Sequence, residues 1–180
     1  DCMKKKYAVG IDVGGTTAKF GIVDRNGNIL FSSEISTRNH KEVEGFIDEL
    51  HESLYPLIER AGGPGRIKGI GLGAPNGNIY TGTIEYAPNL PWKGIIPLAK
   101  LVEDKFRLPV TLTNDANAAA IGEMMYGAAQ GMKDFIMITL GTGDPLNGII
   151  VAGKNSPFGN AVYAFDKGDI QPRIGITWDP

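Results

Sequence analysis

Two carboxylates stand among glycines, threonines and asparagines whose types and spacing suit phosphate and hydroxyl chemistry. The first, Asp12, ends an apolar run and precedes the sequence Gly-Gly-Thr-Thr at residues 14–17. Glycines let backbone N–H groups approach phosphate oxygens closely, threonine hydroxyls add donors, and a carboxylate at a strand end can hold Mg²⁺ through water. The sequence contains no P-loop pattern, and no GxGxxG stands at a strand–helix junction, so both phosphate-binding motifs are excluded. Taken alone, the segment is equally well explained as a tight glycine-rich turn.

The second carboxylate, Asp115, lies within Thr-Asn-Asp-Ala-Asn at residues 113–117, where a helix is predicted to begin. The helix macrodipole favours the ionised form of a carboxylate at this end. An aspartate here is also a common helix N-cap, so the position alone does not separate a cap from a catalytic group. Asn114 and Asn117 add amide groups that suit sugar hydroxyls, and this favours a functional site.

A third polar loop repeats the chemistry of the first. Gly141, Thr142 and Gly143 directly follow a predicted apolar strand. One glycine–threonine loop is weak evidence for a ligand. Two such loops on one sheet, on either side of a carboxylate, predict the two halves of a clamp for nucleotide phosphates.

The elements that must position these loops follow from the hydrophobic pattern. Apolar strands are predicted at 7–12, 18–24 and 29–36, and Asn26-Gly27 is a strong hairpin signal, so the chain should open as an antiparallel meander. Apolar residues recur at three- and four-residue steps over 41–61, which predicts an amphipathic helix. The remaining predicted elements are strands at 67–72, 110–112 and 135–140, helices at 98–106 and 116–126, a hairpin at 79–86, and loops at 73–78 and 87–92.

This order of elements predicts an α/β fold, with a mixed sheet and flanking helices. Ligands of such sheets gather at the carboxyl ends of the strands. The loops expected at those ends are residues 12–17, 73–78, 113–117 and 141–143. They are therefore the candidate functional segments.

Composition narrows the function classes. The chain has 180 residues, is 42% hydrophobic and carries a formal net charge of -2, which gives no sign of a nucleic-acid or membrane-surface binder. The single cysteine, Cys2, excludes an internal disulfide and a cysteine-rich zinc cluster. No apolar run approaches the roughly 18 residues of a membrane span. We therefore expect a cytoplasmic protein with no nucleic-acid or membrane partner.

Five motifs together resemble the ROK family of bacterial sugar kinases and sugar-responsive repressors. They lie, in family order, at residues 12–17, 71–75, 87–92, 114–119 with 122–123, and 140–143. The match runs from about Lys5 to Gly143. This resemblance implies the actin-like ATPase fold, a ribonuclease H-like lobe that sugar kinases share with Hsp70 chaperones.

The resemblance also implies roles for individual residues. Asp115 is expected to be the catalytic base, which takes the proton from the sugar hydroxyl that attacks the γ-phosphate of ATP. Asp12 is expected to position Mg²⁺ through water. The expected sugar ligands are Asn76, Asn89 and Asn114, and the expected phosphate ligands are Gly14, Gly15, Thr16, Thr17, Gly141, Thr142 and Gly143. The predicted activity is phosphorylation of a hexose by MgATP, with glucose as the first choice, in a homodimer.

The C-terminal part departs from the family. Family members are considerably longer, and after the second phosphate loop they carry a Gly-Glu-x-Gly-His sugar segment and often a His-Cys₃ zinc site. Here the residues after Gly143 include neither histidine nor cysteine. We therefore expect a sugar- and phosphate-binding lobe at 4–143, a divergent or foreign, partly strand-like tail at 144–180, and little or no catalysis by this chain.

Two alternatives stay open beside the kinase. One is a non-catalytic sugar-binding or regulatory module of the same family. Repression itself is not expected, because only a few residues precede the first strand, where ROK repressors carry a DNA-binding helix-turn-helix. The other is a different actin-like ATPase, against which the motifs at 87–92 and 114–117 argue.

Overall fold

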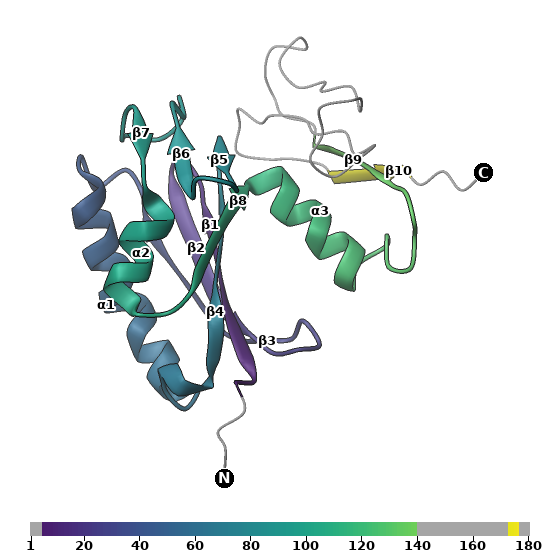
Figure 1. Cartoon of the computed structure of the whole chain (residues 1–180), viewed down its shortest axis with the longest axis horizontal. Coiled ribbons are helices and arrows are strands. Elements are labelled where there is room, and N and C mark those ends of the chain that lie inside the picture. The colour runs from purple at the N-terminus through teal and green to yellow at the C-terminus, as the bar shows by residue number, and fades with distance from the viewer. Residues whose placement is uncertain (1–4, 140–172, 177–180) are drawn as a thin grey trace. The chain divides into compact units, whose positions relative to one another are not determined.

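A computed structural model of the chain describes residues 5–139 and 173–176 (Figure 1). The chain divides into two compact units, residues 1–115 and 116–180. The predicted boundary after Gly143 lies outside the described residues, as do Gly141 and Thr142.

A five-stranded mixed sheet forms the centre of the first unit. Its strands are β1 (Tyr7–Val13), β2 (Thr17–Val23), β3 (Ile29–Ser36), β4 (Ile67–Ala74) and β8 (Val110–Asn114), in the spatial order β3-β2-β1-β4-β8. The first three strands pair antiparallel, which confirms the predicted meander. Strand β4 runs parallel to β1, and β8 runs parallel to β4, so these three strands end at the same edge.

The β2–β3 hairpin is closed by Asp24 and Asn28. One carboxylate oxygen of Asp24 accepts hydrogen bonds from the backbone N–H groups of Asn26 and Asn28, and the other accepts one from Asn28 Nδ2 at 2.9 Å. The side-chain bond from Asn28 lowers the pKa of the Asp24 carboxyl, because it stabilises the charged form. Gly27 supplies the positive φ of 83° that the turn requires.

Two helices cover one face of this sheet, α1 (Val43–Arg60) and α2 (Leu98–Phe106) (Figure 1). The apolar stripe predicted for α1 is fully buried at Phe46, Leu50, Leu54 and Ile58. Helix α1 packs on β2, β3 and α2, and α2 also packs on β8. Alternate residues of β1 and β2 complete this core, which leaves the residues between them on the other face.

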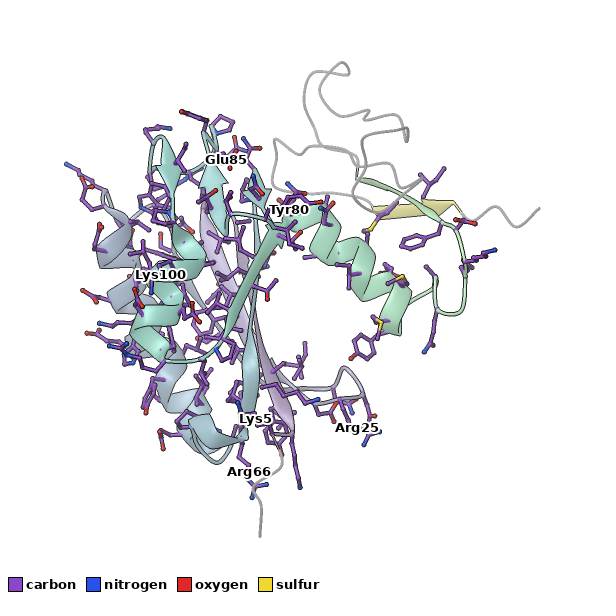
Figure 2. The ribbon with its side chains drawn as sticks, viewed as in Figure 1. Lys5, Arg25, Arg66, Tyr80, Glu85 and Lys100 are labelled. Atoms are coloured by element: carbon purple, nitrogen blue, oxygen red, sulfur yellow. The ribbon has the colours of Figure 1, made fainter. Side chains whose placement is uncertain are left out.

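A smaller antiparallel sheet lies at the carboxyl ends of β1, β4 and β8 (Figure 1). It consists of β5 (Gly77–Asn78), β6 (Thr83–Glu85) and β7 (Ile95–Ile96). Glu85, labelled in Figure 2, holds the hairpin closed by accepting hydrogen bonds from Asn78 Nδ2 at 2.9 Å and Thr83 Oγ1 at 3.0 Å. The prediction was wrong in starting this hairpin at residue 79, and β7 was not predicted.

The second unit contains α3 (Asp115–Tyr126), which begins in the first unit's last residue, and a two-stranded antiparallel sheet of β9 (Ile136–Thr139) and β10 (Arg173–Ile176). Helix α3 begins one residue earlier than predicted, so Asn114, not Asp115, precedes the first helical residue. Within the described part of the chain, the helices lack the combination of length and apolar character that crossing a membrane requires.

Thr37, in the connection between β3 and α1, gives a test of the packing. Its side chain is fully buried, and among the described residues its hydroxyl is the buried side-chain group without a hydrogen-bond partner. Because valine has nearly the same shape and no polar atom, we expect Thr37→Val to raise the free energy of unfolding by about 1 kcal/mol in urea titrations. Thr37→Ser keeps the hydroxyl and loses a methyl group, so it should lower that free energy by about 1 kcal/mol. Destabilisation by valine would show that the hydroxyl is hydrogen-bonded in solution.

Candidate active site at the carboxyl edge of the sheet

The register of the main sheet aligns three of the four predicted loops. The strand before the fourth loop, β9, pairs with β10 in a separate two-stranded sheet, so the prediction that both glycine–threonine loops follow strands of one sheet was wrong. Asp12 on β1 pairs with Gly73 on β4, and Gly73 pairs with Thr113 on β8. Neighbouring strands lie about 4.8 Å apart, so the backbones at Asp12 and Thr113 are about 10 Å apart. Asp115 follows two residues after Thr113. The two candidate carboxylates therefore belong to one edge, separated by a single strand.

Asp12 lies on the face of β1 opposite to the core. Its side chain is exposed, whereas the adjacent Ile11 and Val13 are buried. Its register partner on β2 is Lys19, which is also exposed and pairs in turn with Glu34 on β3. Side chains directly opposite each other on one face interact, so this row alternates in charge across three strands. Lys19 therefore faces outward from β2, at a position beside the predicted metal-binding carboxylate.

The turn between β1 and β2, residues 14–17, touches the loop at residues 87–92. The backbone N–H of Gly14 donates to the Thr17 carbonyl at 3.0 Å and closes the turn. A Cβ on Gly15 would lie 2.5 Å from the carbonyl oxygen of Asn89, so only glycine fits this approach. We call these segments the phosphate turn (14–17) and the sugar loop (87–92), after their predicted ligands. Their contact brings the two predicted binding functions together.

Buried side chains anchor the sugar loop and leave its predicted ligand outside. Ala87, Leu90 and Trp92 are all buried, whereas Pro88 and Asn89 are exposed. The indole Nε1 of Trp92 donates to the backbone carbonyl of His40 at 3.2 Å. The loop is therefore fixed at both ends, with the segment that carries Asn89 held out at the edge of the sheet.

The side chain of Asn76 forms hydrogen bonds with the backbone at and just after β6 of the small sheet. Asn76 adopts a left-handed conformation with φ of 52°, which asparagine tolerates better than most residues. Its Nδ2 donates to the carbonyls of Glu85 at 3.0 Å and Tyr86 at 3.4 Å. Both contacts are structural, so a role of Asn76 as a sugar ligand stays a prediction that depends on its side-chain oxygen.

The predicted loop at 73–78 is shorter than expected, because its ends belong to strands. Strand β4 continues to Ala74 and β5 begins at Gly77. A Cβ on Gly77 would lie 2.5 Å from the Thr113 carbonyl, so this segment packs directly on the end of β8. The loops after β4 and β8 are thereby brought together.

Asp115 is the first residue of α3, where the positive end of the helix macrodipole favours a carboxylate. The strand before it also runs further than predicted, through Thr113 and Asn114, so the carboxylate directly follows the sheet edge. Asn114 and Asp115 are half-buried.

The side chains at this edge suit a magnesium ion held largely by water and phosphate better than a metal ion held entirely by protein ligands. Over residues 5–139 and 173–176, no three His, Cys, Asp or Glu side chains gather as a metal site. Mg²⁺ is typically held by one or two carboxylates together with water and substrate phosphates. The exposed carboxylate of Asp12, next to a glycine turn, matches that pattern.

The ROK family profile matches residues 8–159. The chain belongs to the ROK family. The glucokinase of Streptomyces coelicolor is 36% identical to it over 164 residues, which cover 91% of this chain and 49% of that protein. The xylose repressor of Caldicellulosiruptor bescii is 33% identical over 149 residues, which cover 81% of this chain and 37% of the repressor. This ROK chain thus spans about half the length, or less, of the curated relatives it matches.

The fold agrees with that of solved ROK structures. The ROK family glucokinase of Streptomyces griseus, solved in complex with glucose and AMPPNP, superposes with a TM-score of 0.64 at 36% identity. The superposition covers 76% of this chain and 42% of that one. The predicted actin-like ATPase lobe, with its mixed sheet and flanking helices, is confirmed.

Sequence reasoning missed the part of the ROK lobe that supports these loops. His40 carries no motif, and its contact with Trp92 joins residues 52 positions apart. The one available signal was Trp92 itself, because a buried indole usually has a hydrogen-bond partner for its N–H.

Proposed function

We propose that this chain forms the hexose- and phosphate-binding lobe of an MgATP-dependent hexose kinase, with glucose as the first candidate substrate. The observation that carries the proposal is the contact of Gly15 with Asn89 beside the row of Asp12, Gly73 and Thr113. It gathers a glycine turn suited to phosphate, a carboxylate suited to magnesium and an asparagine suited to sugar hydroxyls. The similarity to glucokinases supports the same assignment.

In this proposal Asp115 is the general base. The oxygen of a hexose hydroxyl attacks the γ-phosphorus of ATP, the bond from that phosphorus to the bridging oxygen breaks, and ADP leaves. The proton of the hydroxyl passes to the Asp115 carboxylate. Because the transition state is loose, the carboxylate mainly orients the hydroxyl and accepts the proton late. Asn89 and Asn114 would fix the sugar by binding neighbouring hydroxyls.

The phosphate turn and Asp12 would hold the other substrate. Backbone N–H groups of residues 14–17 and the hydroxyls of Thr16 and Thr17 are suited to phosphate oxygens. Asp12 would hold Mg²⁺ through water, and that ion supplies neutralisation of the phosphate charge when it is bound. The loop at 141–143 is proposed as the second phosphate contact.

This assignment predicts binding without efficient turnover. We expect calorimetry to detect binding of at least one sugar among glucose, fructose, mannose and an amino sugar. A coupled ADP-release assay should show rates far below the roughly 1–100 s⁻¹ typical of kinases, because closure of a complete site is needed to exclude water from the reaction. Turnover in the normal range would contradict the expectation of an incomplete site, and failure to bind any hexose would reject the proposed function.

The similarity to a xylose repressor favours one second candidate, a non-catalytic sugar-binding module. Such a module has no need to hold nucleotide phosphates. Titration with AMPPNP and Mg²⁺ therefore separates the two candidates. The kinase lobe should bind the nucleotide, and Asp12→Asn should weaken that binding, whereas the sugar-binding module should show neither effect.

The third possibility, another actin-like ATPase, is disfavoured by the family match. The homodimer stays a proposal that light scattering would test.

A further inference from the structure

The connection between β3 and α1, residues 37–42, contacts the phosphate turn. The backbone N–H of Thr37 donates to the carbonyl of Thr16 at 2.9 Å. Thr16 lies between Gly15 and Thr17, so this hydrogen bond holds the middle of the turn from outside the β1–β2 hairpin. We call residues 37–42 the bracing connection.

The same connection also holds the sugar loop. The carbonyl of His40 accepts the hydrogen bond from the Trp92 indole, three residues along from the loop's contact with the phosphate turn at Asn89. The bracing connection, the phosphate turn and the sugar loop therefore form a closed ring of three contacts. A shift of one segment must be accommodated by the other two.

The side chain of His40 fixes the bracing connection to α1. Its Nε2 pairs with Oε2 of Glu49, and its ring meets the edge of Phe46 at 6.3 Å between centroids. The Phe46 ring in turn lies 4.8 Å from that of Trp92. Gly45 leaves room for the imidazole, because a Cβ there would lie 3.1 Å from His40 Nδ1. The imidazole is thus held on two sides, and this fixes the residue whose backbone carbonyl accepts the hydrogen bond from the Trp92 indole.

We infer that His40 and Glu49 are positioning residues that hold the sugar loop and the phosphate turn in one shared arrangement, so that binding of hexose and of phosphate reinforce each other. The ligand part of this inference rests on the proposed function. The physical basis is reciprocal coupling. A ligand that orders one segment of a closed ring lowers the entropic cost of ordering the next segment. Each ligand must then raise the affinity of the other by the same factor.

If the His40–Glu49 pair were only structural, its loss would not affect the two loops. A second ion pair on α1 provides a matched control. Lys105 on α2 pairs with Asp48 at 2.6 Å, one residue before Glu49 on the same helix. That pair joins the two helices and contacts neither loop. Asp48→Ala removes one carboxylate from α1, as Glu49→Ala does, but leaves the bracing connection in place.

The positioning role can be tested without any ligand by hydrogen–deuterium exchange. We expect His40→Ala and Glu49→Ala to speed amide exchange in both 14–17 and 87–92 by about five- to tenfold, which is the scale of one lost side-chain hydrogen bond. Asp48→Ala should leave both segments unchanged. Glu49→Gln, which keeps a hydrogen-bond acceptor, should restore most of the protection. Faster exchange confined to α1, or equal effects in Asp48→Ala, would overturn the positioning role.

The coupling itself is measured by titrating glucose with and without AMPPNP and Mg²⁺. Trp178→Phe leaves Trp92 as the single tryptophan, so its emission reports the sugar loop. In that background we expect the nucleotide to tighten glucose binding by about fivefold or more, the lower range of measured couplings. In Glu49→Ala the factor should fall to near one, while Asp48→Ala keeps it. An unchanged factor in Glu49→Ala would overturn the coupling. Absence of glucose binding by the unmodified chain would reject the proposed function, whereas the exchange comparison would still decide the positioning role.

Discussion

Replacing the aspartate that corresponds to Asp115 by asparagine in a complete ROK glucokinase is expected to lower kcat by about 10²- to 10⁴-fold, the usual value of general-base assistance. Asparagine keeps the shape of the side chain and much of its hydrogen bonding, so the affinity for glucose should change little. The variant also loses a charge at the N-terminus of a helix, which costs only about 0.3–1 kcal/mol. Steady-state kinetics, calorimetry with glucose and thermal melting together measure these three quantities.

Glu123 provides the control for this variant. It lies two turns along α3, and its Oε2 accepts a hydrogen bond from the backbone N–H of Ala128 at 3.0 Å. That contact stabilises the end of the helix, so the matching glutamate-to-glutamine replacement in the same complete enzyme should lower the melting temperature modestly and leave kcat per folded molecule nearly unchanged. Near-normal kcat in the asparagine variant at the Asp115 position would assign that aspartate to the helix start and require another base.

A methyl group at Gly15 should disturb both predicted binding functions at once. Its Cβ would lie 2.5 Å from the carbonyl oxygen of Asn89 and 3.1 Å from the Asn89 Cβ, so the sugar loop must move. We expect Gly15→Ala to weaken binding of both AMPPNP and glucose by more than about tenfold. Overpacking of this kind also costs about 1–3 kcal/mol of stability. Calorimetric titrations and urea unfolding of this chain measure the two effects.

Gly10 is the matched glycine for this experiment. It lies on β1, and a Cβ there would meet no atom within 4 Å. Gly10→Ala should therefore leave both affinities unchanged and raise stability slightly, because glycine is unfavourable inside a strand. If Gly15→Ala binds both ligands as the unmodified chain does, the contact between the phosphate turn and the sugar loop has no functional importance.

The sequence predicted the regular elements well where one physical signal was sufficient. Strand β3 and helix α2 begin and end at the predicted residues, because a hairpin signal precedes the first and apolar spacing defines the second. Strands β4 and β8 run two residues further than predicted. Pro75 and the polar residues after Leu112 suggested loops, but backbone pairing in the parallel register extends to Ala74 and Asn114.

The candidate site was predicted only in part, because residue type and spacing carry no information about distant contacts. Asp12 and Asp115 could be placed at one sheet edge, since parallel strands end together. The approach of Gly15 to Asn89 joins residues far apart in the chain, and nothing in either motif indicates it. The chemistry of Asn76 suited a sugar ligand, yet its amide donors are used by the backbone of β6 and the residue after it.

The alternation of buried and exposed residues in the sugar loop separates anchoring from recognition. Ala87, Leu90 and Trp92 fix the backbone, whereas Pro88 and Asn89 point out of the core. Substitutions at the two exposed positions change the chemistry offered to a ligand, and the buried side chains that anchor the loop are not altered by them. Under the proposed function, such a loop can acquire new sugar preferences by single steps, and a library randomised at residues 88 and 89 tests whether the sugar preference of the lobe can be changed while its fold is preserved.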